Sequence, residues 1–324
     1  MVTHRDDGWA GLRWDGWQDH GDIRRRLDEG ADPERWNGGR ALHRAAAWGS
    51  PEVVAELARR VADVDALEHG TTALWEAVLA DRPDNARALA AAGADPWRPQ
   101  LGGWSPGRLA LAGPTPELFP PPPGERGLTD AERAAAEEGR RLVAALGDAS
   151  YDGTGLACVA GIDAREAIRR LEATPAEGET LAELTELLDD PYAYDLDETL
   201  RFVGVTAVPG GCVVTQPWGY MPSAPGVHTR LSVGTVSYGL YVNPKSGNQG
   251  SIVRDGVVEG WDLHPGGAPG PDASPEEVLA SYLYRHNGVA YSCAYAGLRL
   301  PDARAVAGPP DVWVVLPERD HWAH

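Results

Sequence analysis

The residues of this sequence with the clearest chemical potential are aromatic. Tryptophan and tyrosine combine a large apolar surface with one polar group, so they suit the wall of a pocket that holds an apolar molecule. Ten of them fall between residues 218 and 313, whereas the whole chain has only 2 phenylalanines. Packing in the core or on the surface is the alternative interpretation. The candidates for a ligand pocket are Trp218, Tyr220, Tyr238 and Trp261.

The motifs of several common enzyme classes are missing from the sequence. There is no Gly-x-Ser-x-Gly elbow, no Gly-x-x-x-x-Gly-Lys loop and no dinucleotide glycine motif placed between a strand and a helix. The single lysine, Lys245, lies in an Asn-Pro-Lys-Ser-Gly turn and is unsuited to Schiff-base chemistry. The sequence therefore names no catalytic residue and no cofactor, and it leaves open whether the protein is an enzyme.

Two residue pairs that contain histidine have spacings that metal ligands use, but neither has supporting ligands. They are Asp262 with His264, and His321 with His324. His286 follows a predicted helix end, where a histidine interacts favourably with the last carbonyl groups. We expect no metal site.

Length and composition narrow the class of protein. A chain of 324 residues predicts two domains. With 48 acidic and 29 basic residues, the net charge of -19 disfavours nucleic acid and anionic membrane surfaces as partners. Basic residues that are nearly all arginine, with abundant Ala, Gly and Pro, indicate a bacterial origin. No apolar leader or membrane-spanning stretch is found. We therefore expect a soluble protein. Its three cysteines, Cys158, Cys212 and Cys293, are widely spaced and predict no disulfide framework, which favours the reducing cytoplasm.

Residues 38–96 contain a block of about 32 residues that is written twice. Segments 30–33, 61–64 and 93–96, two of which read Gly-Ala-Asp-Pro, are separated by 31 and 32 residues. Within one block Gly49 ends a first helix, Ser50 caps the next, and Pro51 suits its first position. Each block predicts two short antiparallel helices, and only a stack of blocks buries their apolar faces.

This pattern resembles ankyrin repeats. The resemblance implies an all-α solenoid over residues 1–118, with two full and two partial repeats, and a concave face of turn tips and first-helix side chains that binds a protein partner. In the family the Leu-His pair is structural, so His43 is expected to bond neighbouring backbone. Tryptophan is enriched at binding hot spots, although packing between repeats is the alternative. The candidate partner-binding residues are Trp48, Trp75, Trp97 and Trp104.

A proline-rich linker at residues 119–127 precedes a predicted α+β domain with an antiparallel sheet at residues 128–324. Thr129 and Glu132 form a capping box that opens a helix, and further helices are predicted after residues 163, 180 and 274. Asp255-Gly256 is the strongest hairpin signal. Residues 155–161 are a strand or a helix start. Strands are predicted at 202–208, 212–216, 227–233, 235–242, 249–254, 257–262 and 312–316.

Residues 150–265 carry short motifs in a fixed order: Gly161-Ile-Asp163, Trp218-Gly-Tyr220, Leu231-Ser-Val-Gly-Thr235, Arg254-Asp-Gly256 and Gly260-Trp-Asp262. This order resembles an uncharacterised bacterial domain, and the resemblance implies no catalytic residue.

We expect a protein-binding scaffold or adaptor whose α+β domain binds a ligand or a second partner. The alternative is a cofactor-independent cyclase or isomerase of bacterial specialised metabolism, because positioning alone can lower a barrier substantially. A sensor or immunity factor in bacterial conflict is a third hypothesis.

Overall fold

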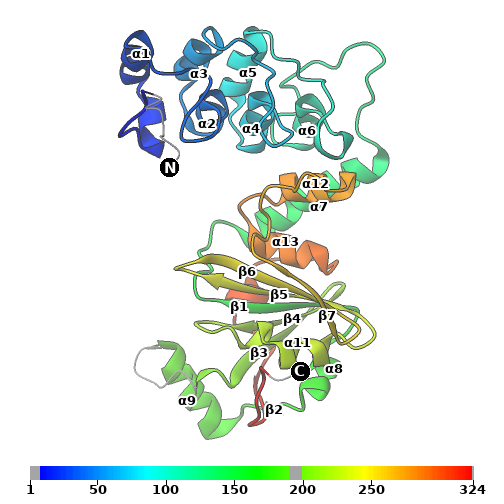
Figure 1. Cartoon of the computed structure of the whole chain (residues 1–324). Coiled ribbons are helices and arrows are strands. Elements are labelled where there is room, and N and C mark those ends of the chain that lie inside the picture. Colours follow the sequence, from blue (N-terminus) through cyan, green and yellow to red (C-terminus); the bar gives the residue numbers. More distant parts are fainter. Residues whose placement is uncertain (1–7, 190–198, 323–324) are drawn as a thin grey trace. The chain divides into compact units, whose positions relative to one another are not determined.

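The computed structural model describes residues 8–189 and 199–322. The chain divides into two compact units (Figure 1). The first comprises Met1–Ala136 with Pro269–Leu283, and the second comprises Glu137–Ala268 with Tyr284–His324. Each unit is described by itself below.

The first unit is a stack of short helices in two rows (Figure 1). The first-helix row contains α2 (Ala41–Trp48), α4 (Ala73–Leu79) and α6 (Pro106–Ala112). The second-helix row contains α1 (His20–Asp28), α3 (Pro51–Ala58) and α5 (Pro83–Ala91). Short 3-10 turns, η1 (Trp14–Gln18) and η2 (Leu101–Gly103), precede α1 and α6. The predicted all-α stack is confirmed.

Local capping explains where several of these helices begin. The hydroxyl oxygens of Ser50, Thr72 and Ser105 accept the backbone N–H three residues further on, at 3.4, 3.2 and 3.2 Å. These bonds satisfy N–H groups that have no partner within the helix. Pro51 occupies the first turn of α3, where its missing N–H costs nothing. The helix start predicted at Ser50 is therefore confirmed by a side-chain contact.

The helix α7 (Asp130–Leu146) begins with the predicted capping box. Thr129 N–H donates to a Glu132 carboxylate oxygen at 2.8 Å, and Glu132 N–H donates to the Thr129 hydroxyl at 3.2 Å. The preceding residues, 119–127, contain no helix or strand. The division between the two units falls within α7.

A segment from far along the chain completes the first unit. The helix α12 (Pro275–Leu283) lies in residues that we assigned to the 128–324 domain, but it packs with α6 and η2. Val278, Leu279 and Tyr282 are buried there. A Cβ placed on Gly113 would lie 2.0 Å from the Tyr282 hydroxyl oxygen, so Gly113 lets the tyrosine approach the end of α6.

The second unit is built on one eight-stranded antiparallel sheet in the order β2-β8-β3-β4-β1-β5-β6-β7. The predicted α+β class with an antiparallel sheet is confirmed. The strands are β1 (Gly155–Ala160), β2 (Thr174–Pro175), β3 (Phe202–Val208), β4 (Gly211–Gln216), β5 (Val236–Asn243), β6 (Gly247–Arg254), β7 (Val257–Asp262) and β8 (Val312–Val315).

Turn chemistry fixes the hairpin between β6 and β7. Asp255 and Gly256 have φ of 48° and 76°, both in the left-handed region. Two such values in succession are typical of a type I′ turn, whose twist matches that of the flanking strands. The hairpin predicted from Asp255-Gly256 is confirmed.

The strand predicted at residues 227–233 is wrong, because residues Pro225–Leu231 form the helix α11. Pro225 occupies the first turn, and Val227 and Leu231 are four residues apart and both fully buried. Their spacing puts both on one helix face, and packing of that face on the sheet overrides the strand propensity of the valines. The turn η3 (Met221–Ser223) leads into α11.

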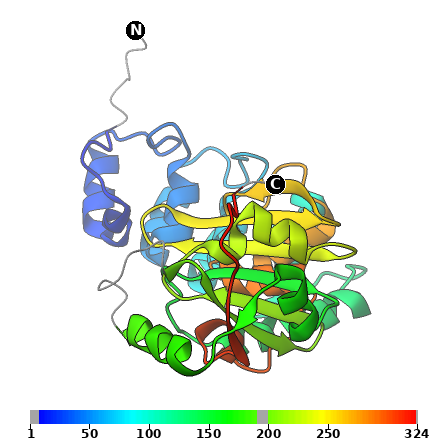
Figure 2. The same cartoon turned by 90° about the horizontal axis from the view of Figure 1, so that it is seen from below.

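Helices lie on both faces of the sheet (Figures 1 and 2). On one face, Ala157 and Val159 of β1 share a core with Leu231 of α11 and Leu171 of α8 (Ala164–Leu171). In Figure 2, α11 lies in front of the strands. On the other face, Cys158 meets α13 (Gly288–Tyr295). The remaining described helices are α9 (Gly178–Asp189) and α14 (Arg304–Ala307).

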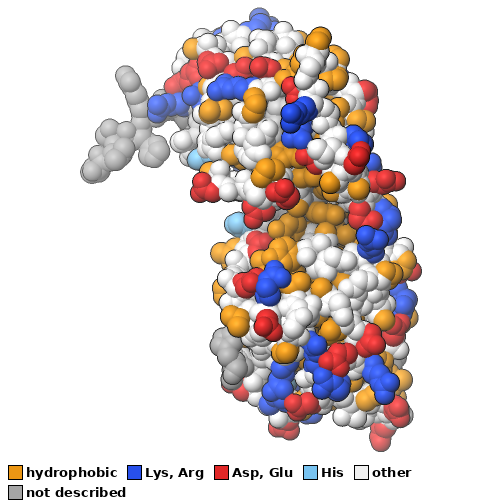
Figure 3. All heavy atoms as spheres, turned by 90° about the vertical axis from the view of Figure 1, so that its right-hand side faces the viewer, with side chains coloured by type: hydrophobic (Ala, Val, Ile, Leu, Met, Phe, Trp, Pro, Cys, Tyr) orange, Lys and Arg blue, Asp and Glu red, His pale blue; other side chains and the backbone are white. Residues whose placement is uncertain are grey.

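Charges on the second unit form local pairs. Lys and Arg side chains lie among Asp and Glu side chains over the lower part of Figure 3. Glu166 contacts Arg169 and Arg170 at 2.7 and 2.8 Å, and Glu172 contacts Arg319 at 2.7 Å. Such exposed pairs each contribute little to stability. No helix in the described ranges combines the length and apolar character needed to cross a membrane.

Candidate functional site

Two tight turns project between the helix pairs of the first unit. The first is closed by pairing of Trp36 with Gly39, and the second by pairing of Glu68 with Thr71. The two central residues of each turn have φ between 47° and 90°. Both turns are therefore of the type I′ kind, in which Gly, Asn and a few other residues are tolerated. They are called the hairpin turns below.

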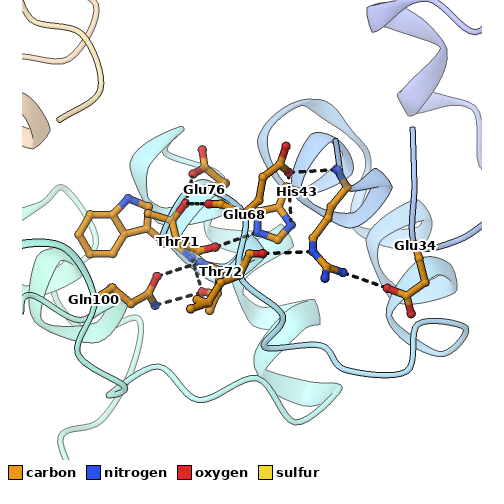
Figure 4. Close-up of polar contacts among 10 residues, drawn as sticks. Glu34, His43, Glu68, Thr71, Thr72, Glu76 and Gln100 are labelled. Atoms are coloured by element: carbon orange, nitrogen blue, oxygen red, sulfur yellow. Dashed lines mark hydrogen bonds and ion pairs between the residues drawn. The ribbon is translucent and has the colours of Figure 1, made fainter. Parts of the chain in front are cut away.

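Side chains of the following repeat bond the backbone just after each turn (Figure 4). A Glu68 carboxylate oxygen accepts the backbone N–H of Arg40 at 3.1 Å. One repeat later, the side-chain carbonyl of Gln100 accepts the N–H of Thr72 at 2.8 Å. Both bonds join residues 28 positions apart. The same structural contact is thus made by a glutamate in one repeat and by a neutral glutamine in the next.

His43 lies beneath the second hairpin turn (Figure 4) and is only 5% exposed. Its Nε2 lies 3.0 Å from the carbonyl oxygen of Thr71, which can only accept, so Nε2 carries the proton. Burial lowers the pKa of His43, which keeps the ring neutral near pH 7. The prediction that His43 bonds neighbouring backbone is confirmed.

The neutral state of His43 leaves Nδ1 as an acceptor. This atom has no hydrogen bond and faces a Glu68 carboxylate oxygen 3.9 Å away. Two acceptors therefore face each other with no donor between them.

Glu76 of α4 is a second carboxylate next to this turn (Figure 4). The Thr71 hydroxyl donates to its Oε1 at 2.9 Å. Burial raises the pKa of Glu76, and the negative charge of Glu68 raises it further, whereas the hydrogen bond from Thr71 acts in the opposite direction. A carboxylate in this environment is stabilised by any additional donor.

A groove of about 630 Å³ lies beside the hairpin turns. Three carboxylate side chains line it, those of Asp32, Glu34 and Glu68. Arg40 also lines it, but its guanidinium is held by Glu34 at 3.0 Å and by the Leu67 carbonyl oxygen at 3.2 Å. The remaining lining residues are Arg35, Gly38, Gly39 and His69.

An aromatic and cationic cluster lies on α2. The guanidinium carbon of Arg44 is 5.5 Å from the Trp48 ring centroid and 5.8 Å from that of Trp36. Cation–π contacts of this kind fix the position of the indole rings. Trp48 remains 41% exposed, so a large apolar side chain is held at the surface.

The comparison with known families settles the nature of the stack. A family model described as ankyrin repeats (3 copies) matches residues 18–100. Residues 18–100 are ankyrin repeats. Such repeats indicate a protein-interaction scaffold. No curated protein matches this chain. The likeness of residues 150–265 to an uncharacterised bacterial domain stays a prediction.

The four tryptophans proposed to bind a partner occupy different environments in the ankyrin stack. Trp48 is exposed, Trp97 is half-buried against Gly107, and Trp75 and Trp104 are each 1% exposed. Trp75 occupies the position equivalent to His43 one repeat later, and like His43 it is buried. Trp104 lies under α12 and donates its indole N–H to the Pro275 carbonyl oxygen at 2.8 Å. Of these four candidates, only Trp48 offers a largely exposed ring.

The four aromatic residues proposed to line a ligand pocket lie at separate places in the second unit. Tyr238 is fully buried, and its hydroxyl donates to an Asp262 carboxylate oxygen at 2.7 Å. Trp261 precedes Asp262 in the strand, so it faces the opposite side of the sheet and is 63% exposed. Trp218 is 48% exposed, and Tyr220 packs on Tyr241 with ring centroids 5.8 Å apart.

The residues considered as metal ligands make structural contacts instead. An Asp262 carboxylate oxygen accepts the backbone N–H of His264 at 2.9 Å. His321 is buried, and its Nε2 lies 3.0 Å from the Pro317 carbonyl oxygen, while His324 lies outside the described residues. Within residues 8–189 and 199–322, no group of three or more His, Cys, Asp or Glu side chains is arranged to hold a metal ion.

A buried histidine that the sequence analysis did not single out belongs to α11. His228 is 0% exposed, and its Nδ1 is 3.3 Å from the Ser251 hydroxyl oxygen. Burial lowers the pKa of His228 to about 3, so the ring is neutral. We missed it because the composition of residues 227–233 is typical of a strand. The Pro225-Gly226 start and the four-residue spacing of Val227 and Leu231 were the available signals.

Proposed function

We propose that this protein is an adaptor that binds a protein partner on the first-helix row and hairpin turns of its ankyrin stack, with Trp48 as the main anchor. The observation that carries this proposal is the exposed indole of Trp48, held against the guanidinium of Arg44. A large ring that is already fixed loses little conformational entropy on binding.

The groove beside the hairpin turns supports the same surface. Its volume of about 630 Å³ is in the range that accommodates several side chains of a partner. It is lined by residues of the turns and by Arg40 just before α2. The turns are anchored to the stack by Glu68 and Gln100, so their polar groups are already in place before a partner arrives.

For the second unit we propose a role in binding a further partner or an apolar ligand. Exposed apolar side chains on and near β7 support this role, namely those of Val257, Trp261 and Leu263. The alternative of a cofactor-independent cyclase or isomerase is favoured by no specific arrangement of Trp218, Tyr220, Tyr238 and Trp261.

We expect the protein in the bacterial cytoplasm, from its cysteine and arginine usage.

The test of the proposed function uses a displayed library of random short peptides selected on the immobilised full chain. Fluorescence anisotropy then gives the Kd of enriched peptides for the wild type, Trp48→Ala and Trp322→Ala. Trp322 is a matched control, 54% exposed in the second unit. We expect Trp48→Ala to weaken binding about tenfold or more, because aromatic anchors dominate interface energies, and Trp322→Ala to leave it unchanged. Equal affinity for the wild type and Trp48→Ala contradicts the proposal.

A further inference from the structure

We infer that the protein partner presents an arginine or lysine side chain to the carboxylates of Glu68 and Glu76. This inference rests on the proposed binding face and specifies the chemistry of its occupant. It follows from which charges on that face are already satisfied and which are not.

The carboxylate of Glu68 faces an acceptor on one side. It accepts the Arg40 backbone N–H at 3.1 Å, but it also faces the acceptor Nδ1 of His43 at 3.9 Å. His43 is 5% exposed and cannot turn away, because its Nε2–H is bonded to the Thr71 carbonyl oxygen. A hydrogen-bond donor that reaches Glu68 from the groove therefore stabilises the carboxylate, which the acceptor Nδ1 of His43 cannot do.

Glu76 adds a second carboxylate, whose pKa burial raises although the hydrogen bond from Thr71 and the charge of Arg44 act to lower it. It accepts a hydrogen bond from the Thr71 hydroxyl, a neutral donor, at 2.9 Å. Arg44 occupies the equivalent position one repeat earlier, on the neighbouring helix α2. Its guanidinium lies against the rings of Trp36 and Trp48, so it is held in place by aromatic contacts.

Two arginines, Arg35 and Arg40, line the groove together with the three carboxylates of Asp32, Glu34 and Glu68. Arg40 bonds Glu34 at 3.0 Å and the Leu67 carbonyl oxygen at 3.2 Å. The groove retains the carboxylates of Asp32 and Glu68. Charge complementarity therefore favours a cationic side chain of the partner at this groove.

Two substitutions remove a charge from this site and keep the hydrogen bonds that the glutamates accept. Glu68→Gln keeps the oxygen that accepts the Arg40 N–H, and Gln100 already makes this contact in the next repeat. Glu76→Gln likewise keeps an acceptor for the Thr71 hydroxyl. Glu52→Gln is the matched control, because Glu52 is exposed on α3 in the other row.

The experiment selects peptides from the same displayed library on the wild-type chain and counts Arg and Lys in the enriched sequences relative to the unselected library. The Kd of those peptides is then measured for each variant. We expect enrichment of Arg and Lys in the wild-type selection. We also expect about tenfold weaker binding by Glu68→Gln and Glu76→Gln, with no change for Glu52→Gln.

The outcomes separate this inference from the proposed function. Peptides that depend on Trp48 but show no Arg or Lys enrichment overturn the inference and leave the proposed binding face intact. Cationic peptides that bind both Gln variants as tightly as the wild type also overturn it. Binding that is indifferent to Trp48→Ala, or no enrichment of any peptide, contradicts the proposed function itself.

Discussion

The indole N–H of Trp104 donates to the carbonyl oxygen of Pro275 at 2.8 Å, which joins residues 171 positions apart in the chain. Trp104 precedes α6, the last helix of the ankyrin stack, and Pro275 opens α12. The end of a repeat stack otherwise exposes an apolar face, and α12 covers it. A helix encoded late in the chain therefore completes the first unit.

Replacing Trp104 by phenylalanine is expected to destabilise the chain by about 1 kcal/mol or more, because the hydrogen bond to the Pro275 carbonyl oxygen is lost and the smaller ring fills less of the buried site of Trp104. The substitution also weakens the stacking of Arg108, whose guanidinium carbon lies 4.3 Å from the Trp104 ring centroid. Urea unfolding followed by circular dichroism measures the change. Trp48→Phe is the control, expected to cost less than about 0.5 kcal/mol at an exposed site. Equal effects of the two variants contradict the role given to Trp104.

Gly239 of β5 is expected to tolerate no side chain. A Cβ there would lie 2.3 Å from His228 Cε1 and 2.8 Å from the Ser251 hydroxyl oxygen. Gly239→Ala should therefore cost about 1–3 kcal/mol of stability through overpacking. A Cβ added to Gly260 of β7 would meet no atom within 4 Å, so Gly260→Ala is the control in the same sheet. Thermal unfolding compares the two, and a Gly239→Ala protein as stable as Gly260→Ala refutes the prediction.

His228 is expected to make stability depend on pH. Its folded pKa of about 3 lies below its ordinary value of 6.5, so its neutral form is favoured in the fold. The resulting stability is fully present above pH 6.5 and is lost as the pH falls toward 3. Between pH 7 and pH 5 the loss is about 2 kcal/mol.

The measurement compares urea unfolding of the wild type with that of His228→Gln at both pH values. The stability difference between them should shift by about 2 kcal/mol in favour of the variant at pH 5, because glutamine does not titrate. His286→Gln, at an exposed position, is the control and should follow the wild type. A difference that is constant with pH would show that His228 does not titrate as proposed.

The cysteines are expected to resist alkylation in the native protein. All three are fully buried, and the Sγ atoms of Cys158 and Cys293 are 3.6 Å apart. The contact with Cys293 and burial raise the pKa of Cys158, and burial raises the pKa of Cys212 to about 12. Labelling by iodoacetamide should be slower than in urea by on the order of a hundredfold. Mass spectrometry reads the result, and rapid native labelling of any one cysteine contradicts it.

Local sequence rules predicted much of the secondary structure. The capping box at Thr129 and Glu132 and the type I′ turn at Asp255 both form as expected, because each depends on residues that are close in sequence. The prediction of a strand at residues 227–233 was wrong, because the structure of this segment depends on contacts with residues distant in sequence. Its valines suit a strand, but packing of Val227 and Leu231 on the sheet favours a helix.

The sequence by itself determined the repeat stack, because a period of about 32 residues encodes one helix pair each time and the pairs can only stack on one another. Only the tertiary structure decided which tryptophans are exposed, that α12 caps the stack, and that Tyr238 and Trp261 lie on opposite faces of the sheet. Spacing specifies the face on which a side chain lies. What covers that face depends on elements distant in sequence.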